Sequence, residues 1–305
     1  MKDEEALLQL QQSDNYRVLE RLNPPGRYLT GEPLTPRIGL VLDTETTGLD
    51  TAKDKIIELG FVAFAYDAGS GRIYNILHHY DGFEDPGEPL DVVVKELTGI
   101  SDEMVAGQHL DDEQIELWLK KADLIIAHNA GFDRQMLERR MPIVVEKNWA
   151  CTLNDIDWQA EHIGSLKLDY IAYKLGYFFE GHRAVVDAQA TLHLLTKALP
   201  VTAKAGMTRL LEKAREKSRR LFAVGAPFEK KDELKERGYR WLADLSFTDP
   251  YGKVKKGVWS KLISEPEFES EEQWLSSVVY SGKPALFVKR DILPCDRYSV
   301  REFCL

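Results

Sequence analysis

Two acidic side chains follow a short apolar segment that has the character of a buried strand. Asp43 and Glu45 come directly after the run Ile38–Leu42. Residues two apart in a strand point to the same side of a sheet, so we expect these carboxylates to project together. Neighbouring carboxylates repel unless a cation neutralises them, and a divalent ion prefers their oxygens. The pair therefore indicates a metal site, with a solvated strand end as the simpler alternative.

Two later segments carry acidic residues at predicted helix starts. Asp133 follows His128-Asn129, in the first turn of a helix expected after the strand 123–127. His182 precedes another helix, and Asp187 lies in that helix's first or second turn. Taken singly, the two aspartates suit the positive end of a helix dipole, and the histidine suits an ordinary surface. The spacing also allows Asp187 to reach a metal while His182 reaches a water beside it.

The elements that must position these residues alternate along the chain. Apolar runs predict strands at 38–42, 56–66, 72–79, 123–127 and 149–152. Helical spacing predicts helices at 111–121, 132–140, 166–175 and 184–199. A three-strand meander followed by strand–helix alternation predicts an α/β fold, with a mixed sheet flanked by helices.

The regions outside this core follow different patterns. Residues 1–35 contain a predicted helix at 3–22, and residues 36–200 form the predicted catalytic domain. Residues 201–220 are rich in Lys and Arg and predict one basic linker helix. Residues 221–305 predict a small α+β domain of unknown role, with a hairpin turn at 249–252.

Charge is distributed unevenly over the 305 residues. The net charge of −10 argues against a nucleic-acid partner, but residues 1–200 carry 19 Lys+Arg against 34 Asp+Glu, and residues 201–305 carry 21 against 16. A mildly basic tail would favour a polyanion, although different surfaces alone would explain the asymmetry. The absence of a long apolar run, of a secretory signal and of paired cysteines predicts a cytoplasmic protein without a membrane segment.

Together the three motifs resemble the DnaQ-like exonucleases, in the branch whose third motif carries a histidine. That branch includes the proofreading subunit of bacterial replicative DNA polymerase. The resemblance covers Ile38–Leu199, and all five positions occur in the family's order: Asp43, Glu45, Asp133, His182 and Asp187. It also covers Lys55–Gly60, similar to the family's second strand, and Leu97–Ile100, similar to a substrate-side loop. It implies a ribonuclease H-like fold.

The resemblance also implies an activity. Such enzymes release nucleoside 5′-monophosphates from 3′ ends, using two Mg²⁺ or Mn²⁺ ions held about 3.5–4 Å apart. By this likeness Asp43 would bridge both ions, Glu45 and Asp187 would complete the first, and Asp133 would support the second. His182 would take a proton from the attacking water, a role that suits an ordinary pKa of about 6.5.

Substrate contacts are expected next to the motifs. Thr46, Thr47 and Leu49 would hold the terminal nucleotide, and Asn129 would hydrogen-bond the strand, with core packing as the alternative for Leu49. Single-stranded DNA 3′ ends are the preferred substrate, and a polymerase or repair protein is a possible partner. An exoribonuclease and an exonuclease-like scaffold stay open as rivals. The tail's tryptophans, at 241, 259 and 274, are read as core in preference to base-stacking residues.

Overall fold

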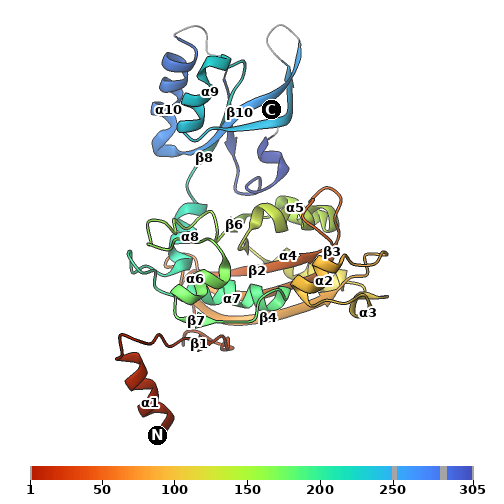
Figure 1. Cartoon of the computed structure of the whole chain (residues 1–305), viewed down its shortest axis with the longest axis vertical. Helices are drawn as coiled ribbons and strands as arrows, with labels where there is room; N and C mark the ends of the chain where they lie inside the picture. Colours follow the sequence, from red (N-terminus) through yellow and green to blue (C-terminus); the bar gives the residue numbers. More distant parts are fainter. Residues whose placement is uncertain (1, 249–252, 282–286, 304–305) are drawn as a thin grey trace. The chain divides into compact units, whose positions relative to one another are not determined.

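The computed structural model describes residues 2–248, 253–281 and 287–303 of the chain. The chain divides into two compact units, Met1–Ala214 and Arg215–Leu305. Figure 1 shows the larger unit as a sheet with helices and the smaller unit as a second sheet with its own helices. Each unit has its own buried hydrophobic cluster and is described separately below.

The larger unit is built on a five-stranded sheet of order β4-β3-β2-β5-β6. Its strands are β2 (Pro36–Thr46), β3 (Ile56–Asp67), β4 (Ile73–Phe83), β5 (Leu124–Ala127) and β6 (Trp149–Cys151). The pairs β2–β3 and β3–β4 are antiparallel, whereas β2–β5 and β5–β6 are parallel. The predicted mixed sheet, with its initial meander, is confirmed.

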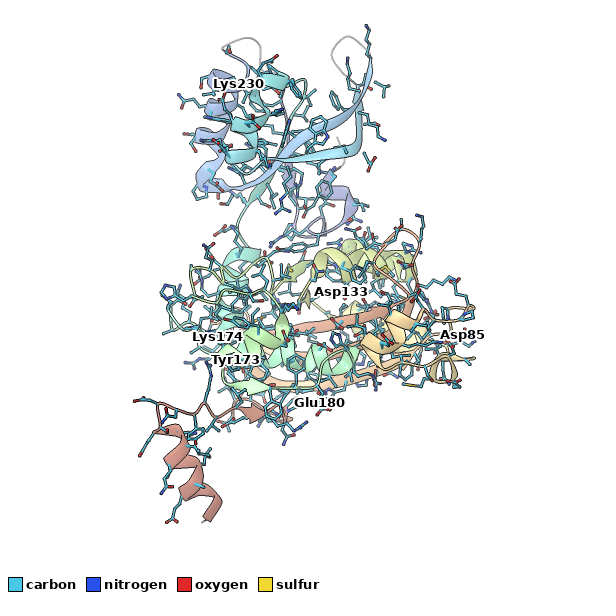
Figure 2. The ribbon with its side chains drawn as sticks, in the orientation of Figure 1. Asp85, Asp133, Tyr173, Lys174, Glu180 and Lys230 are labelled. Atoms are coloured by element: carbon cyan, nitrogen blue, oxygen red, sulfur yellow. The ribbon has the colours of Figure 1, made fainter. Side chains whose placement is uncertain are left out.

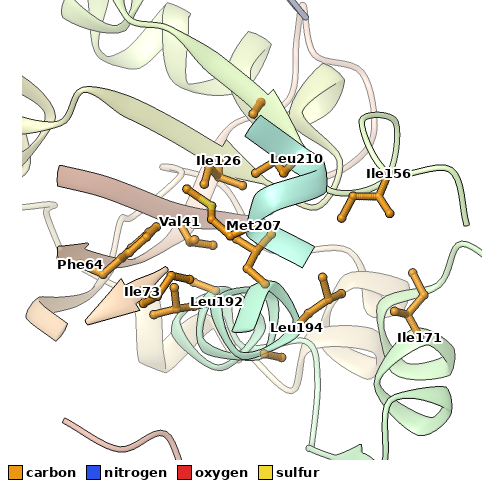
Figure 3. Close-up of a cluster of buried hydrophobic side chains, with 14 of the residues drawn as sticks. Val41, Phe64, Ile73, Ile126, Ile156, Ile171, Leu192, Leu194, Met207 and Leu210 are labelled. Carbon is orange, nitrogen blue, oxygen red and sulfur yellow. The ribbon is translucent and has the colours of Figure 1, made fainter. Parts of the chain in front are cut away.

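Helix α7 (Ala184–Thr196) packs against β2 and β3 on one face of this sheet. Helix α8 (Gly206–Ala214) continues the cover. Figure 3 shows Met207 and Leu210 of α8 pointing into a cluster that also holds Val41, Ile126 and Leu192. The face that contains Val41 is also the face of Asp43 and Glu45, because side chains alternate along a strand.

The predicted basic helix at 201–220 is wrong in both extent and character. The helix ends at Ala214, and Ser218–Ala223 form strand β8 of the smaller unit. A Cβ atom on Gly206 would lie 3.0 Å from the carbonyl oxygen of Leu194, so the start of α8 packs closely on α7. The prediction rested on the number of Lys and Arg residues and missed the buried face of α8, which packs the helix onto the larger unit.

The N-terminal helix is also shorter than the prediction of 3–22. Helix α1 spans Lys2–Gln11, and Glu20–Arg21 form strand β1, which pairs in parallel with β7 (Tyr177–Phe178). Arg17 donates hydrogen bonds of 2.8 Å to the carbonyl oxygens of both Tyr173 and Lys174. These tertiary contacts hold the segment extended where its local apolar spacing favours a helix.

The remaining helices of this unit are α2 (Val92–Thr98), α3 (Asp102–Val105), α4 (Asp112–Lys121), α5 (Ala130–Arg140) and α6 (Leu168–Lys174), with a 3-10 turn at Pro142–Glu146. The expected loop Leu97–Ile100 is therefore the end of α2 and its cap. Gly99 ends the helix at a φ of 69°, and Ile100 is buried. Helix α2 begins with Val92, Val93 and Val94, and because β-branched residues favour strands, local propensity did not predict this helix.

The smaller unit is an antiparallel sheet of order β11-β8-β10-β9, with two α-helices among its described residues. Its further elements are β9 (Arg240–Thr248), β10 (Val254–Ser264), β11 (Val288–Ile292), α9 (Lys231–Glu236) and α10 (Phe268–Trp274), extended by a π turn at Leu275–Val279. Leu221, Leu234 and Ile263 form part of its core. The predicted small α+β fold is confirmed, and the expected turn at 249–252 lies outside the described residues. Among the described helices, none is long and apolar enough to cross a membrane.

Candidate active site

Three of the predicted catalytic carboxylates converge at the end of β2. Asp43 and Glu45 lie on the strand, and Asp187 comes from α7. One carboxylate oxygen from each of the three lies within 4.8 Å of the other two. Residues 144 positions apart in the sequence thus form a single acidic group, as the motif spacing predicts.

Gly60 on β3 makes this approach of α7 possible. It is the register partner of Asp43, so its missing side chain would project on the same face of the sheet. A Cβ atom at Gly60 would lie only 2.0 Å from the backbone nitrogen of Val185 and 2.3 Å from the carbonyl carbon of Ala184. The first turn of α7 therefore rests directly on the backbone of β3, beside Asp43.

Glu58 fixes the same helix end by hydrogen bonds. It is the register partner of Glu45 and is completely buried. One carboxylate oxygen accepts from Nε of Arg183 at 2.9 Å, and the other accepts from the backbone N–H of Ala184 at 3.0 Å. The carboxylate thus satisfies an N–H group at the helix start that has no partner inside the helix. Glu58 thus has a structural role, and the residues that it holds belong to the third motif.

Asp133 reaches the site from the other side of β2. It lies on α5 and is only 3% exposed, and its Oδ1 accepts hydrogen bonds from the backbone N–H and the hydroxyl of Thr44, at 3.1 and 2.9 Å. Figure 2 places Asp133 between α5 and β2. Its partner Thr44 points to the opposite face from Asp43 and Glu45. This geometry explains why Asp133 lies beside the three-carboxylate group and is not part of it.

His182 precedes α7 with an exposed side chain and a left-handed backbone, at a φ of 68°. A residue other than glycine in this region is uncommon, and such strain is concentrated at functional sites. Asp187 accepts a hydrogen bond of 3.1 Å from the backbone N–H of Arg183, and the positive charge of His182 acts to lower the pKa of Asp187. His182 is therefore electrostatically coupled to the acidic group.

Burial and mutual repulsion raise the pKa values of all four carboxylates. Burial is the larger cause for Asp43, whose pKa lies well above its ordinary range, and Asp133 is the strongest neighbouring charge. Burial, followed by the charge of Asp187, raises the pKa of Glu45 to about 8. Burial also raises the pKa of Asp133 to about 7 and that of Asp187 to about 6. Near neutral pH the fully ionised form of the four carboxylates is therefore unfavourable unless a cation is bound.

A divalent cation fits this donor set. The three oxygens within 4.8 Å of one another are all carboxylate ligands, with no sulfur among them. Such ligands suit Mg²⁺ and Mn²⁺ better than soft metals. A bound cation also offsets the repulsion that raises the four pKa values.

The predicted substrate contacts lie around the turn after β2 and at the start of α5. The hydroxyl of Thr46 donates to the carbonyl oxygen of Gly48 at 2.6 Å, and the hydroxyl of Thr47 accepts from the backbone N–H of Lys55 at 3.0 Å. These bonds fix the turn. Leu49 is 88% exposed, so the core-packing alternative for it is wrong. Asn129 is exposed, and its side chain does not cap α5.

Sequence reasoning did not identify Gly60 and Arg183 as parts of the site. The signal for Glu58 was visible, because a charged residue interrupts the apolar strand Ile56–Phe61. The close approach at Gly60 had no comparable signal, since glycine occurs in strands for several reasons.

Comparison with known proteins places the chain in a family. The RNase_T family model, described as an exonuclease, matches residues 40–195. DNA polymerase III PolC-type of Thermotoga maritima is 29% identical over 249 residues, covering 75% of this chain and 17% of the relative. The same enzyme of Listeria innocua is 34% identical over 167 residues, covering 52% of this chain and 11% of the relative. The chain thus spans less than a fifth of the length of these relatives.

Solved structures of similar fold include two exonucleases. Exonuclease X in complex with 5′ overhanging duplex DNA is 25% identical, with a TM-score of 0.38 over 56% of this chain and 99% of that one. Escherichia coli exonuclease I in complex with a dA16 oligonucleotide is 16% identical, with a TM-score of 0.46 over 74% of this chain and 63% of that one. From the family match and the five motif positions, the chain belongs to the RNase_T exonuclease family and is of the DnaQ-like type.

Proposed function

We propose that the protein removes nucleoside 5′-monophosphates from the 3′ ends of single-stranded DNA, with two divalent ions and with His182 as general base. The observation that carries this proposal is the convergence of Asp43, Glu45 and Asp187 within 4.8 Å, next to the strained backbone of His182. The activity needs an acidic group that binds cations and a nearby base that is free to move a proton.

The ions are Mg²⁺ or Mn²⁺ in this proposal. Asp43, Glu45 and Asp187 would hold one of them, and Asp43 and Asp133 would support the other, directly or through water. Such ions would neutralise the phosphoryl group, activate the attacking water and stabilise the leaving oxygen. Glu58 holds Ala184 at the start of α7, so Asp187 meets Asp43 without further rearrangement.

His182 acts on the attacking water. A ring nitrogen of its neutral form accepts the proton. The exposed side chain of His182 allows the proton to pass to solvent after each turnover. The left-handed backbone is stabilised by the fixed start of α7 that follows it.

The terminal nucleotide binds at the turn after β2. The exposed side chain of Leu49 packs against the terminal base, and the backbone of Thr46 and Thr47 faces the terminal sugar. Asn129 hydrogen-bonds the strand from the start of α5. We favour DNA over RNA because the curated relatives are DNA polymerases. On the same ground we propose that the protein acts in the cytoplasm. We propose that it takes part in DNA replication or repair, together with a polymerase or a repair protein.

The experiment is hydrolysis of matched 5′-labelled DNA and RNA oligonucleotides by the full chain. With Mg²⁺, DNA should shorten in steps of one nucleotide and faster than RNA. Faster degradation of RNA would show that RNA 3′ ends, and not DNA 3′ ends, are the preferred substrate. If neither shortens with Mg²⁺ or Mn²⁺, the scaffold alternative is favoured. His182→Ala should lower kcat by at least about 100-fold, because a general base contributes about that much.

A further inference from the structure

Trp241, on strand β9 of the smaller unit, exposes half of its surface. The sequence reading placed it in a core together with Trp259 and Trp274. Those two side chains do pack against the buried cluster, but Trp241 is 50% exposed. The exposed part of this indole offers a flat aromatic face on which another ring can stack.

The indole is held in a fixed position on the hairpin of β9 and β10. A Cβ atom on Gly257 would lie 2.1 Å from Cζ2 of Trp241, so the ring lies directly over the glycine backbone. Gly257 has a φ of 87° and lies at a register shift between Lys256 and Val258. The ring of Trp259 meets Trp241 edge-on, with centroids 5.5 Å apart and an interplanar angle of 62°. The backbone and a second indole thus immobilise one side of a ring that is otherwise open to solvent.

The hairpin that carries this indole is rich in cations. Residues 240–261 contain five cations, at 240, 253, 255, 256 and 261, and two acids, at 244 and 249. Arg240 and Lys255 are exposed, and neither forms an ion pair with any residue that the structure describes. Two other cations of the hairpin form ion pairs, Lys256 with Asp244 at 3.1 Å and Lys261 with Glu271 at 3.2 Å. The hairpin therefore combines a fixed aromatic ring with an excess of cations over acids, in which Arg240 and Lys255 are exposed.

We propose that Trp241 stacks on a base of single-stranded nucleic acid, while the exposed cations of the hairpin neutralise its phosphates. Stacking on aromatic side chains within a positive surface is the usual means of holding a single strand without sequence preference. A duplex keeps its base faces covered, so the site selects unpaired nucleotides. The inference rests on the proposed function in one respect: it assigns the smaller unit to the same class of substrate.

The test measures binding of a 5′-fluorescein-labelled (dT)₂₀ to the full chain by anisotropy, in EDTA to prevent hydrolysis. Trp241→Ala should raise Kd about 5- to 150-fold, which corresponds to the loss of one stacked base. Trp241→Phe keeps a ring and should bind within a few-fold of wild type, whereas Trp241→Leu should resemble Trp241→Ala. Phe228→Ala is the matched control, because Phe228 is another aromatic of this unit, 74% exposed, and its loss should leave Kd unchanged.

An oligonucleotide of the same length and charge without bases separates stacking from electrostatics. Wild type and Trp241→Ala should bind this abasic strand equally. Equal loss on both strands would overturn the proposal, as would wild-type binding of (dT)₂₀ by Trp241→Ala, which would favour a protein partner for this surface. Thermal melting checks each variant, and if Trp241→Ala does not fold, the comparison of Phe with Leu decides.

Hydrolysis of a trinucleotide separates this proposal from the proposed function. A trinucleotide occupies the exonuclease site alone, so Trp241→Ala should cleave it at the wild-type rate. A lower rate on this substrate would overturn the separate stacking site. If wild type itself fails to cleave, the proposed function fails, but the binding assay in EDTA still tests Trp241.

Discussion

Glu45→Gln should stabilise the metal-free protein at alkaline pH while it abolishes activity. Glu45 has its pKa raised from an ordinary 4.5 to about 8, by burial and then by the charge of Asp187. A raised pKa means that folding favours the protonated form, so this contribution is fully present below pH 4.5 and is lost as pH rises through 8. Above pH 8 the loss amounts to about 5 kcal/mol, at 1.36 kcal/mol per pKa unit.

Glutamine preserves the size of the side chain and removes its charge. Since Gln must still be buried as a polar group, we expect the variant to recover about 2–4 kcal/mol of that loss. For a unit of this size the melting temperature should rise by about 4–16 °C at pH 9. The assay is thermal melting in EDTA from pH 5 to pH 9, with the transition of the larger unit followed by circular dichroism.

Two further comparisons make the test specific. At pH 5 the wild type and the variant should melt together, because Glu45 is then protonated. Adding Mg²⁺ at pH 9 should raise the melting temperature of the wild type and leave that of Glu45→Gln almost unchanged. Glu88→Gln, an exposed substitution, is the control and should show no pH-dependent gain. If Glu45→Gln melts no higher than wild type at pH 9, the carboxylates do not repel one another as proposed, and the argument for a metal site at this position fails.

The remaining predictions concern how the site is supported. Glu58→Ala should destabilise the unit by about 2–4 kcal/mol and lower activity, because it leaves Arg183 and an N–H of α7 without their acceptor; unchanged melting would show that Glu58 does not hold the helix. Gly60→Ala should reduce activity more than Gly164→Ala, a position where an added Cβ meets nothing within 4 Å; equal activities would contradict the close approach of α7. A chain that ends after residue 214 should melt like the larger unit of the full chain, whereas one that ends after 202 loses α8 and should be less stable by more than about 3 kcal/mol; equal melting would remove α8 from the core.

Sequence patterns predicted the catalytic sheet well because its strands are marked by strong local signals. The run Ile38–Leu42 and the segment 123–127 are continuous apolar stretches, which are typical of central strands. The antiparallel meander and the parallel strands then follow from short turns and intervening helices. The positions of the five motif residues at strand ends and helix starts follow from the same signals.

The failures occur where tertiary contacts override local preference. Residues 12–22 have helical apolar spacing, yet the hydrogen bonds of Arg17 to the end of α6 and the pairing of β1 with β7 hold this segment extended. Residues 215–220 continue a basic pattern, but Ser218 begins a strand because it pairs with Ser264 of β10. Trp241 has a large apolar side chain of the kind found in cores, and only its half-exposed surface in the folded hairpin shows that it lies outside the core. None of these outcomes depends on residues close in the sequence.

The most direct test of the account compares wild type with Asp187→Asn on one 5′-labelled single-stranded DNA in Mg²⁺. The side chain of Asp187 joins α7 to the two carboxylates of β2, so the whole site depends on it. We predict that wild type gives a ladder of products one nucleotide apart and stops in EDTA, and that Asp187→Asn, correctly folded, gives almost none. Wild-type degradation by Asp187→Asn, or internal cleavage of a closed circular strand, would contradict the account.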